Sequence, residues 1–470
     1  MIKQGNQGEK DLKDTCLTRN VIRSSSFYKR FFGLTFAIAL QNLLTYSVGL
    51  ADNLMLGAYD QTALSGVALC NQIQFLLQML VAGASDGVVV IGAQYWGKGK
   101  LDPIVQIIGA ALRYALGIGL IIFGIVICFP SQVLGLLTND PEIVAAGTEY
   151  LKIICFSYLI FAVTNVLAAS LRSVGIVKIG YMISGSTLCI NICLNYCLIY
   201  GNFGMPELGI RGSAIATLIA RIVEFIIIII YFKYKKTGLE ITLKKLMKVD
   251  KRYREDYRKF SLPVLLNQFQ WGIAQSVQTA VLGHLGGTAI VANSIAVITF
   301  QILSVVVYGS AGASGLMIGK TIGERKNEKL KELVKTLQIV FVGLGLVAGI
   351  AILLASGPIL SFYNITEEAQ GLARQFMVIM AVTTIGTAYQ MSCDSGIIRA
   401  GGDTSFSAKM NFISMWGIIV PLSCIGAFIL KLPTVVVFFL LKWDQIYKCI
   451  PVAIRLHRWK WIRIATREDV

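Results

Sequence analysis

Charged residues are scarce in this chain. Only 15% of its 470 residues are charged and 55% are hydrophobic, whereas an average soluble domain has roughly 25% charged residues. A chain of this composition does not have enough polar side chains to enclose its apolar ones in a water-soluble globule. The composition therefore argues against an ordinary soluble protein and predicts an integral membrane protein.

Residue types that perform catalysis or bind metals are also few. The two histidines, His284 and His457, lie in loops predicted to face opposite sides, and the sequence has no Walker-type GxxxxGK[ST] segment to bind a nucleotide. The ten cysteines include no CxxC pair, and the stripe of Cys189, Cys193 and Cys197 has no histidine beside it. Helix packing is the better interpretation of that stripe. We expect no enzymatic activity, no cofactor, and no metal beyond a possible Na⁺.

The chain does contain an internal repeat. The segment "LGAYDQTALSGVA" at 56–68 returns as "LGHLGGTAIVANS" at 282–294, and "GASDGVVVIGAQYWGKGK" at 83–100 returns as "GSAGASGLMIGKTIGERK" at 309–326. Gly57, Gly83 and Gly97 each have a glycine 226 residues later, and Arg172 has Arg399 at a spacing of 227. Two homologous apolar halves are typical of a membrane transporter that binds its substrate between two lobes.

About twelve apolar stretches reach the ~20 residues needed to cross a bilayer. They lie near 31–57, 62–96, 103–129, 143–170, 176–200, 210–232, 258–283, 288–320, 333–356, 367–399, 406–430 and 433–454. Six spans per half is an even number, so both halves enter the membrane from the same side. The sequence predicts an all-α membrane protein with lobes at 31–232 and 258–454, related by a pseudo-two-fold axis along the membrane normal.

Basic residues are concentrated in three segments outside the spans. The net charge is +17, and lysine and arginine gather in the tail at 1–30, the linker at 233–257 and the tail at 455–470. Loops such as "YDQTA", "LTNDPE" and "HLGGTA" contain neither residue. The positive-inside rule then places both termini and the linker in the cytoplasm of a plasma (inner) membrane protein. Because this charge flanks spans, it does not indicate nucleic-acid binding. Residues 1–30 have no signal-peptide h-region, so we expect the first span to be retained.

Four sequence motifs give the chain a family resemblance. They are "ADNLMLG" at 51–57, "AQYWGKGK" at 93–100, "NICLNYCLIYGNFGMPELGIRGSAIATLIAR" at 191–221 and "GIIRAGGDT" at 396–404. In this order and spacing they resemble the multidrug and toxin extrusion (MATE) family, from about residue 31 to 455. The resemblance implies a twelve-helix antiporter that expels cationic or amphiphilic organic compounds in exchange for Na⁺ or H⁺. We expect it to act as a monomer in the bilayer.

Oxygen-bearing side chains are predicted to meet in the outer half of the first lobe. Asp52 lies about five residues before the outer end of the first span, roughly 7 to 8 Å deep at 1.5 Å per residue. Asn191 and Asn195 share one face of the fifth span, and Thr217 lies at a similar depth on the sixth. A carboxylate in the membrane is costly and therefore usually functional or paired. These oxygens suit a hard cation or a proton, and the resemblance implies a cation site at the same positions.

The chain departs from the family pattern in ways that favour this first-lobe site. Asn195 stands where one branch of the family has a second acid, while Trp271 and Ala388 stand where another branch has acids in the second lobe. Ala37 replaces a proline often seen in the first helix, although its repeat mate Pro263 remains. We therefore expect coupling through the first lobe, without bending at a first-helix proline.

Further polar residues within the spans are candidates for secondary roles. Asp86 either tunes the site or serves as a partner for Arg113 or faces a water-filled cytoplasmic cleft, and Asp394 is expected to pair locally with Arg399. On the sixth span Arg221 should pair with Glu224, three residues on, and lies near enough to tune Asp52. The seventh span has a polar stripe that either lines a substrate cleft or packs helices together: Gln268, Trp271, Gln275 and Gln278.

Two other functions compete with ion-coupled efflux. A lipid-linked oligosaccharide flippase of the same superfold should have a cleft ringed by several basic residues, and the spans here offer few. A channel or a structural membrane protein would rarely combine a two-lobe repeat with a single buried acid. The sequence therefore favours a secondary multidrug antiporter, and it identifies neither the substrate nor the coupling ion.

Overall fold

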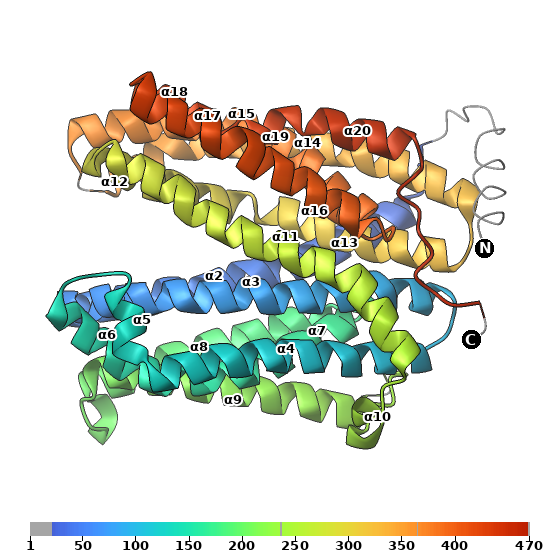
Figure 1. The fold of residues 1–470 in the computed structure, drawn as a ribbon, viewed down its shortest axis with the longest axis horizontal. Helices are drawn as coiled ribbons and strands as arrows, with labels where there is room; N and C mark the ends of the chain where they lie inside the picture. Colours follow the sequence, from blue (N-terminus) through green and yellow to red (C-terminus); the bar gives the residue numbers. More distant parts are fainter. Residues whose placement is uncertain (1–20, 236, 364, 469–470) are drawn as a thin grey trace. The chain divides into compact units, whose positions relative to one another are not determined.

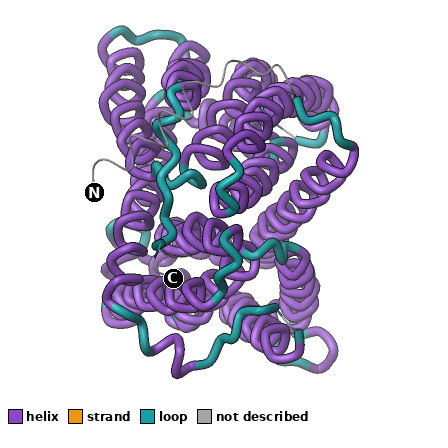
Figure 2. The backbone as a smooth tube through the Cα atoms, turned by 90° about the vertical axis from the view of Figure 1, so that its right-hand side faces the viewer, coloured by secondary structure: helices purple, strands orange, loops and turns teal. Residues whose placement is uncertain are grey.

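The structure is a computed structural model that describes residues 21–235, 237–363 and 365–468. In these ranges every regular secondary-structure element is a helix (Figures 1 and 2). The backbone pairs as β-structure only at one isolated bridge, between Gly402 and Ile462. The helices of the first half and the linker are α2 (Ser25–Tyr59), α3 (Gln61–Gly97), α4 (Asp102–Cys128), α5 (Pro130–Gly135), α6 (Pro141–Ile154), α7 (Phe156–Ser173), α8 (Lys178–Tyr200), η1 (Asn202–Gly204), α9 (Gly209–Tyr234) and α10 (Leu243–Met247).

The helices of the second half are more often interrupted. They are α11 (Lys251–His284), α12 (Gly287–Leu303), α13 (Val305–Gly323), α14 (Asn327–Ser361), α15 (Glu367–Cys393), η2 (Asp394–Ile398), α16 (Thr404–Phe412), η3 (Ile413–Ile419), α17 (Val420–Cys424), η4 (Ile425–Ile429), α18 (Thr434–Lys442), α19 (Asp444–Tyr447) and α20 (Cys449–His457). Three short π-helical stretches, η2, η3 and η4, interrupt the α-helical winding.

Within the described ranges, ten helices are long and apolar enough to cross a membrane. The predicted seventh and twelfth spans are not among them, although both are helical. Within the predicted seventh span α11 carries one asparagine and four glutamines between 267 and 278. The α18–α20 run contains Lys442, Asp444 and Lys448 in its middle. The predicted fourth and eighth spans are each broken once, at Cys155 and at Ser304. The all-α membrane fold class expected from the sequence is confirmed.

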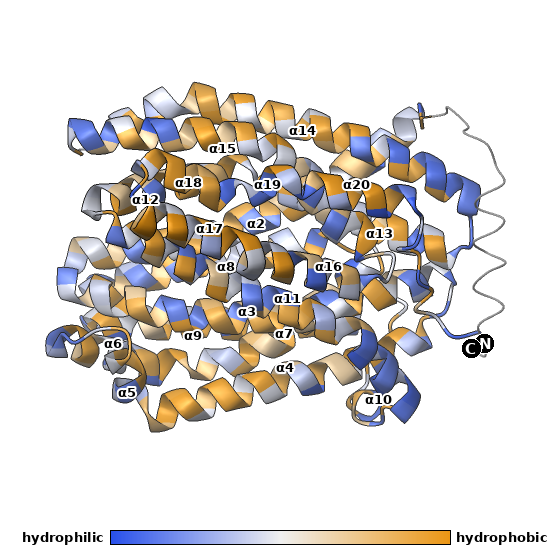
Figure 3. Cartoon of the chain, turned by 45° about the horizontal axis from the view of Figure 1, so that its top comes forward, coloured by the Kyte–Doolittle hydropathy of each residue, from blue (hydrophilic) through white to orange (hydrophobic). Residues whose placement is uncertain are grey.

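The contacts divide the chain into two compact units. Unit 2 comprises Leu40–Gly92 and Lys100–Gly272, and in it α9 packs against α6, α7 and α8, while α4 packs against α7 and α10 (Figure 1). Its long helices α4 and α9 are apolar along most of their length, whereas α10 is hydrophilic (Figure 3). Asp52 and the other residues of the predicted cation site all belong to this unit.

Unit 1 comprises the described residues through Ala39, Ala93–Gly99 and the chain from Ile273 onward. Its central helix is α15, which contacts α12, α13, α14, α18, α19 and α20. The rings of Phe376 and Phe438 stack with their centroids 3.8 Å apart in the core of this unit. The last described segment also packs here: Trp461 is fully buried, and the buried Asp403 forms ion pairs with Arg455 and Arg463.

The sequence repeat reappears as reciprocal contacts between glycines and their partner helices. A Cβ atom on Gly83 of α3 would lie 2.5 Å from the Cα of Leu265 on α11, within unit 2. A Cβ atom on Gly309 of α13 would lie 3.0 Å from the Cβ of Ala39 on α2, within unit 1. Gly309 is the repeat mate of Gly83, and Leu265 is the repeat mate of Ala39, each 226 residues later. The same helix contact therefore occurs twice, once in each unit, with the glycine supplied by the first repeat in unit 2 and by the second repeat in unit 1.

A second close approach involves two glycines that are themselves repeat mates. A Cβ on Gly97 of α3 would lie 2.1 Å from the carbonyl oxygen of Lys320, and one on Gly323 of α13 would lie 2.0 Å from that of Gln94. Real Cβ atoms do not approach backbone so closely, so a side chain at either position would push the two helices apart. The repeated glycines therefore serve backbone packing at this crossing.

Candidate functional site

The hairpin of α8 and α9 positions most of the predicted cation site. It turns through Gly201 (φ +69°) and Gly209 (φ +53°), conformations that favour glycine. The backbone N–H of Leu208 donates to the carbonyl of Leu198 at 2.8 Å. A Cβ on Gly212 would lie only 2.4 Å from that same carbonyl oxygen, so the two helices pack with their backbones nearly touching. This close packing brings polar side chains of α8 and α9 together.

The four predicted site residues form one hydrogen-bonded chain. The Nδ2 of Asn195 donates to Oδ1 of Asp52 at 2.5 Å and to Oδ1 of Asn191 at 3.2 Å. The Nδ2 of Asn191 donates in turn to Oγ1 of Thr217 at 3.1 Å. All four side chains are buried; Asp52 is 7% exposed and the two asparagines are fully enclosed. The structure therefore brings together, on α2, α8 and α9, the residues that the sequence pattern predicted to converge.

The oxygen atoms of this chain fit a hard cation or a proton. Within the described residues, Oδ1 of Asn195 is buried and accepts no hydrogen bond. A buried oxygen without a hydrogen-bond donor costs free energy, and a bound cation or proton would supply the missing partner. Asp52 adds a carboxylate, and Asn191 and Thr217 add further oxygens. Carboxylate, amide and hydroxyl oxygens are the ligands that hard cations prefer. Asp52 lies seven residues before the end of α2, hence about 10 Å from it at 1.5 Å per residue, because the helix continues past the predicted end.

An ion pair lies one turn away from this chain on α9. Nη1 of Arg221 is 2.7 Å from Oε2 of Glu224, and both side chains are largely buried. The guanidinium also lies over the ring of Phe161. The predicted pairing of Arg221 with Glu224 is confirmed. The role of Arg221 in tuning Asp52 stays a prediction.

Asp86 has a different partner from the one considered in the sequence analysis. Nη2 of Arg172, at the end of α7, lies 3.7 Å from Oδ1 of Asp86, and both side chains are partly exposed. Arg113 instead donates to the backbone carbonyl of Met247, because α4 packs against α10. The suggested pairing of Asp86 with Arg113 was therefore wrong.

Asp394 is buried among neutral donors. The hydroxyl of Ser407 and the amide of Asn411 donate to its two carboxylate oxygens at 2.5 and 3.2 Å. Both donors come from α16, which sequence spacing did not reveal. The expected pairing with Arg399 stays a prediction.

The polar stripe of α11 divides between the two compact units. Gln268 and Trp271 belong to unit 2, where the Trp271 ring lies 6.2 Å from that of Phe75. Gln275 and Gln278 belong to unit 1, and Gln278 is the buried member, accepting a hydrogen bond from Lys442 at 3.2 Å. The stripe residues thus have separate local surroundings.

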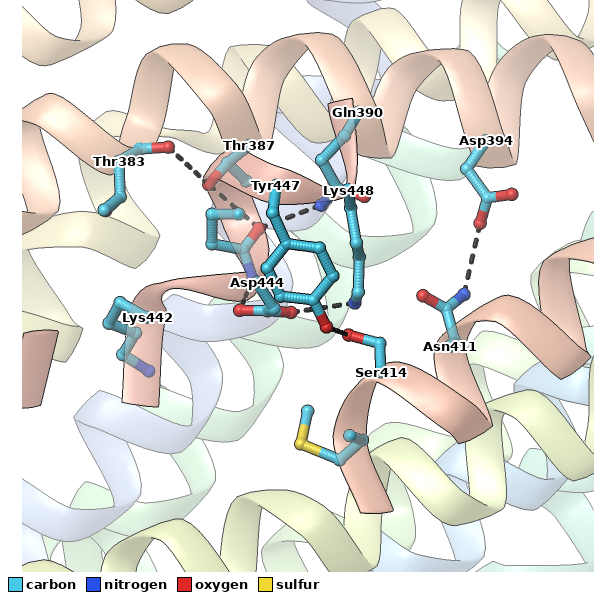
Figure 4. Close-up of polar contacts among 12 residues, drawn as sticks. Thr383, Thr387, Gln390, Asp394, Asn411, Ser414, Lys442, Asp444, Tyr447 and Lys448 are labelled. Atoms are coloured by element: carbon cyan, nitrogen blue, oxygen red, sulfur yellow. Dashed lines mark hydrogen bonds and ion pairs between the residues drawn. The ribbon is translucent and has the colours of Figure 1, made fainter. Parts of the chain in front are cut away.

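Unit 1 also contains a buried polar cluster that was not predicted from the sequence (Figure 4). It is built around Asp444, whose Oδ2 lies 2.8 Å from Nζ of Lys448 and whose Oδ1 accepts from Gln445 at 2.9 Å. Gln390 and Thr387 of α15 donate to Oε1 of Gln445 at 2.8 and 3.1 Å. The signal was present in the segment "LKWDQIYK" at 441–448, where an acid and a lysine stand four residues apart within a span.

Comparison with known proteins identifies the family. The MatE family model matches this chain twice, at residues 37–197 and 263–425, and the two matches begin 226 residues apart. The transporter YisQ of Bacillus subtilis, which is described as uncharacterized, is 25% identical over 397 residues, covering 83% of this chain and 86% of the relative. The probable multidrug resistance protein NorM of Thermotoga maritima is 25% identical over 377 residues, or 80% of each chain.

Solved structures agree with this assignment at the level of the fold. An outward-facing multidrug resistance MATE family transporter of the MOP superfamily aligns with a TM-score of 0.83 and 19% identity, covering 94% of this chain and 99% of that one. A MATE structure in the bent conformation aligns with a TM-score of 0.83 and 18% identity, covering 93% and 97%. The chain belongs to the MATE family and is a multi-pass membrane transporter.

Proposed function

We propose that the protein is a secondary antiporter that exports cationic or amphiphilic organic compounds in exchange for Na⁺ or H⁺. The observation that carries this proposal is the chain from Asp52 through Asn195 and Asn191 to Thr217. It combines one carboxylate with neutral oxygens at membrane depth, and one of those oxygens, Oδ1 of Asn195, has no partner among the described residues. The relatives named as multidrug resistance proteins support the substrate class.

The exchange follows from competition for one charge. A cation or proton bound at Asp52 neutralises its carboxylate, and a cationic substrate is attracted to the carboxylate once that ion has left. Each ligand then stabilises the conformation in which it binds better, and the two binding events oppose one another. A membrane potential supplies ~2.3 kcal/mol per charge per 100 mV, which is enough to drive export without ATP.

The basic segments define the proposed orientation. The linker at 233–257 contains lysines and arginines on both sides of α10, and the exposed Lys245 pairs with Glu240 at 2.8 Å rather than packing into a core. By the positive-inside rule the linker and both termini face the cytoplasm, and the protein lies in the plasma membrane. In that orientation Asp52 lies in the outer half of the bilayer, where it meets the external ion first.

Efflux from proteoliposomes tests this function. Purified protein is reconstituted, the vesicles are loaded with a panel of fluorescent organic cations, and an inward Na⁺ or H⁺ gradient is imposed. We expect one gradient to accelerate efflux above the rate in protein-free vesicles. Efflux that responds to neither gradient would contradict ion-coupled antiport.

A further inference from the structure

The last described residues of the chain pack onto unit 1 as a strap. This tail strap, residues 459–468, follows α20 and forms no helix, and Figure 1 draws it as the dark red trace beyond α20. The side chain of Trp461 is fully buried, and its Nε1 donates to the carbonyl of Leu456 at 3.2 Å. The backbone N–H of Arg463 donates to the carbonyl of Gly401 at 2.7 Å. The strap therefore has a defined seat in unit 1.

The motif "GIIRAGGDT" at 396–404 forms this seat. Its Asp403 is fully buried, and Oδ1 of that residue lies 2.9 Å from Nη2 of Arg463 on the strap. A buried carboxylate requires such a partner, because an unpaired charge in the interior is costly. Gly401 leaves room for the ring of Trp461, with which a Cβ atom at that position would collide. The acid and the glycine of the motif thus fit the residues of the strap.

The other side of the strap is bonded to the end of α3 through Gln94. The Nε2 of Gln94 donates to the carbonyls of Ala400 and Arg463 at 3.2 and 3.4 Å. Its Oε1 accepts from the backbone N–H of Ala465 at 2.8 Å. Gln94 is fully buried, so losing these partners would leave an amide unsatisfied in the interior. One side chain of α3 therefore joins the seat and the strap.

Two further residues of α3 and the turn after it contact the strap. The buried hydroxyl of Tyr95 accepts from the backbone N–H of Arg467 at 3.2 Å. The Nζ of Lys98 donates to the carbonyl of the same residue. With Gln94, these residues belong to the motif "AQYWGKGK" at 93–100. Two motifs that lie about 300 residues apart in the sequence thus meet at the strap.

Helix α3 passes from one compact unit into the other. Its residues up to Gly92 belong to unit 2, whereas Ala93–Gly97 belongs to unit 1. At Gly97 the helix meets the backbone of α13 with no room for a side chain. Close backbone packing depends on distance alone, and the strap adds directional hydrogen bonds to it. A rearrangement of the two units has to carry this end of α3 out of unit 1 or bend α3 beside it.

We propose that the tail strap is a latch that keeps the cytoplasmic side of the transporter closed. The inference rests on the proposed antiport function and orientation, because alternating access requires the cytoplasmic side to open once in every cycle. With the strap seated, Gln94 and Tyr95 hold the end of α3 in unit 1. Breaking these hydrogen bonds lets that end leave, so the strap sets how often the cytoplasmic side opens.

A distance measurement tests the latch without any transport assay. Spin labels are attached in a background without the native cysteines at Lys100→Cys in unit 2 and Asn327→Cys in unit 1, two exposed positions. Double electron–electron resonance on the purified protein in detergent gives the distribution of distances between the labels. Gln94→Met keeps the length of the side chain and removes its donor and its acceptor. We expect this variant to raise the ratio of long to short distances by about 10-fold, or about 1.4 kcal/mol.

A second variant and a control separate the latch from a merely structural role. A chain ending after Ile464 retains Trp461 and the pairing of Arg463 with Asp403, loses the strap residues that bond to α3, and should shift the ratio in the same direction. Gln132→Met makes the matched substitution at an exposed position of α5 and should leave the distances unchanged. Thermal unfolding of each variant is measured alongside.

The inference is overturned if Gln94→Met and the shortened chain both keep the wild-type distances, whether or not their melting temperatures fall. A lower melting temperature with unchanged distances would mean that the strap only stabilises unit 1. Wild-type protein that exports no organic cation under either ion gradient, while the two variants still shift the distances, would contradict the proposed antiport and leave the latch standing.

Discussion

Replacing Asp52 by asparagine should uncouple transport while leaving the protein folded. The substitution keeps the shape of the side chain and removes the one carboxylate of the hydrogen-bonded chain on α2, α8 and α9. One charge moving down 100 mV contributes ~2.3 kcal/mol, which supports a substrate ratio of roughly 50-fold because about 1.4 kcal/mol corresponds to tenfold. We expect Asp52→Asn to lose this roughly 50-fold substrate ratio, once for every charge that the wild-type protein couples to export.

The folding free energy should change by no more than about 1 kcal/mol. The bond from Asn195 becomes a neutral one, which costs part of a charge-assisted hydrogen bond. Removal of a buried charge offsets this cost. The assay is dye accumulation in proteoliposomes with an imposed potential and ion gradient, with thermal unfolding in detergent measured alongside. Asp60→Asn is the matched control, because Asp60 is exposed and caps α3, a role that asparagine also fills. Asp52→Asn protein that still pumps at the parental rate across the pH range would refute the assignment and make Asp86 the next candidate.

Three further predictions concern orientation and packing. A cysteine introduced at Thr237, in a background without the native cysteines, should react with an impermeant maleimide only after permeabilisation. Labelling in intact cells would show that the linker faces the outside and would contradict the proposed topology. Gly97→Ala should lower the free energy of unfolding by about 1 to 3 kcal/mol through overpacking. Gly343→Ala, with open space around its Cβ, should not. Equal melting temperatures for the two variants would show that the two helices move apart at the Gly97 crossing without loss of stability. Asp403→Asn should lower the unfolding free energy by about 1.5 to 3 kcal/mol by weakening two arginine contacts, and an unchanged urea midpoint would mean that the tail does not stabilise the fold.

The sequence was sufficient to predict the fold class and the convergence of the first-lobe residues. Spacing of four residues put Asn191 and Asn195 on one helical face, and counting residues from the span ends put Asp52 and Thr217 at similar depths. The repeat was visible as conserved glycine spacing, because glycines at helix crossings leave an unambiguous pattern. Hydrogen-bond direction within the chain required the structure.

Partners set by tertiary packing could not be predicted. Asp86 pairs with Arg172 and not with Arg113 because of where α7 ends and because α4 contacts α10. Neither feature can be predicted from the spacing of residues along the sequence. The cluster around Asp444 was overlooked because the apolar residues on both sides of it led us to count the whole segment as a span. Three charges inside one span were the clue, and Asp444 and Lys448 pair locally. The donors that orient the neighbouring Gln445 lie on α15, more than fifty residues earlier in the chain.

Antiport itself is tested most directly by running the exchange in reverse. Proteoliposomes containing the wild-type protein are given a gradient of an organic cation and no ion gradient, and ion movement is followed with a pH-sensitive dye and with radioactive sodium. We predict that substrate flowing down its gradient drives Na⁺ or H⁺ uphill in the opposite direction, and that Asp52→Asn abolishes this movement. Substrate that equilibrates in the wild type without moving either ion would contradict the account.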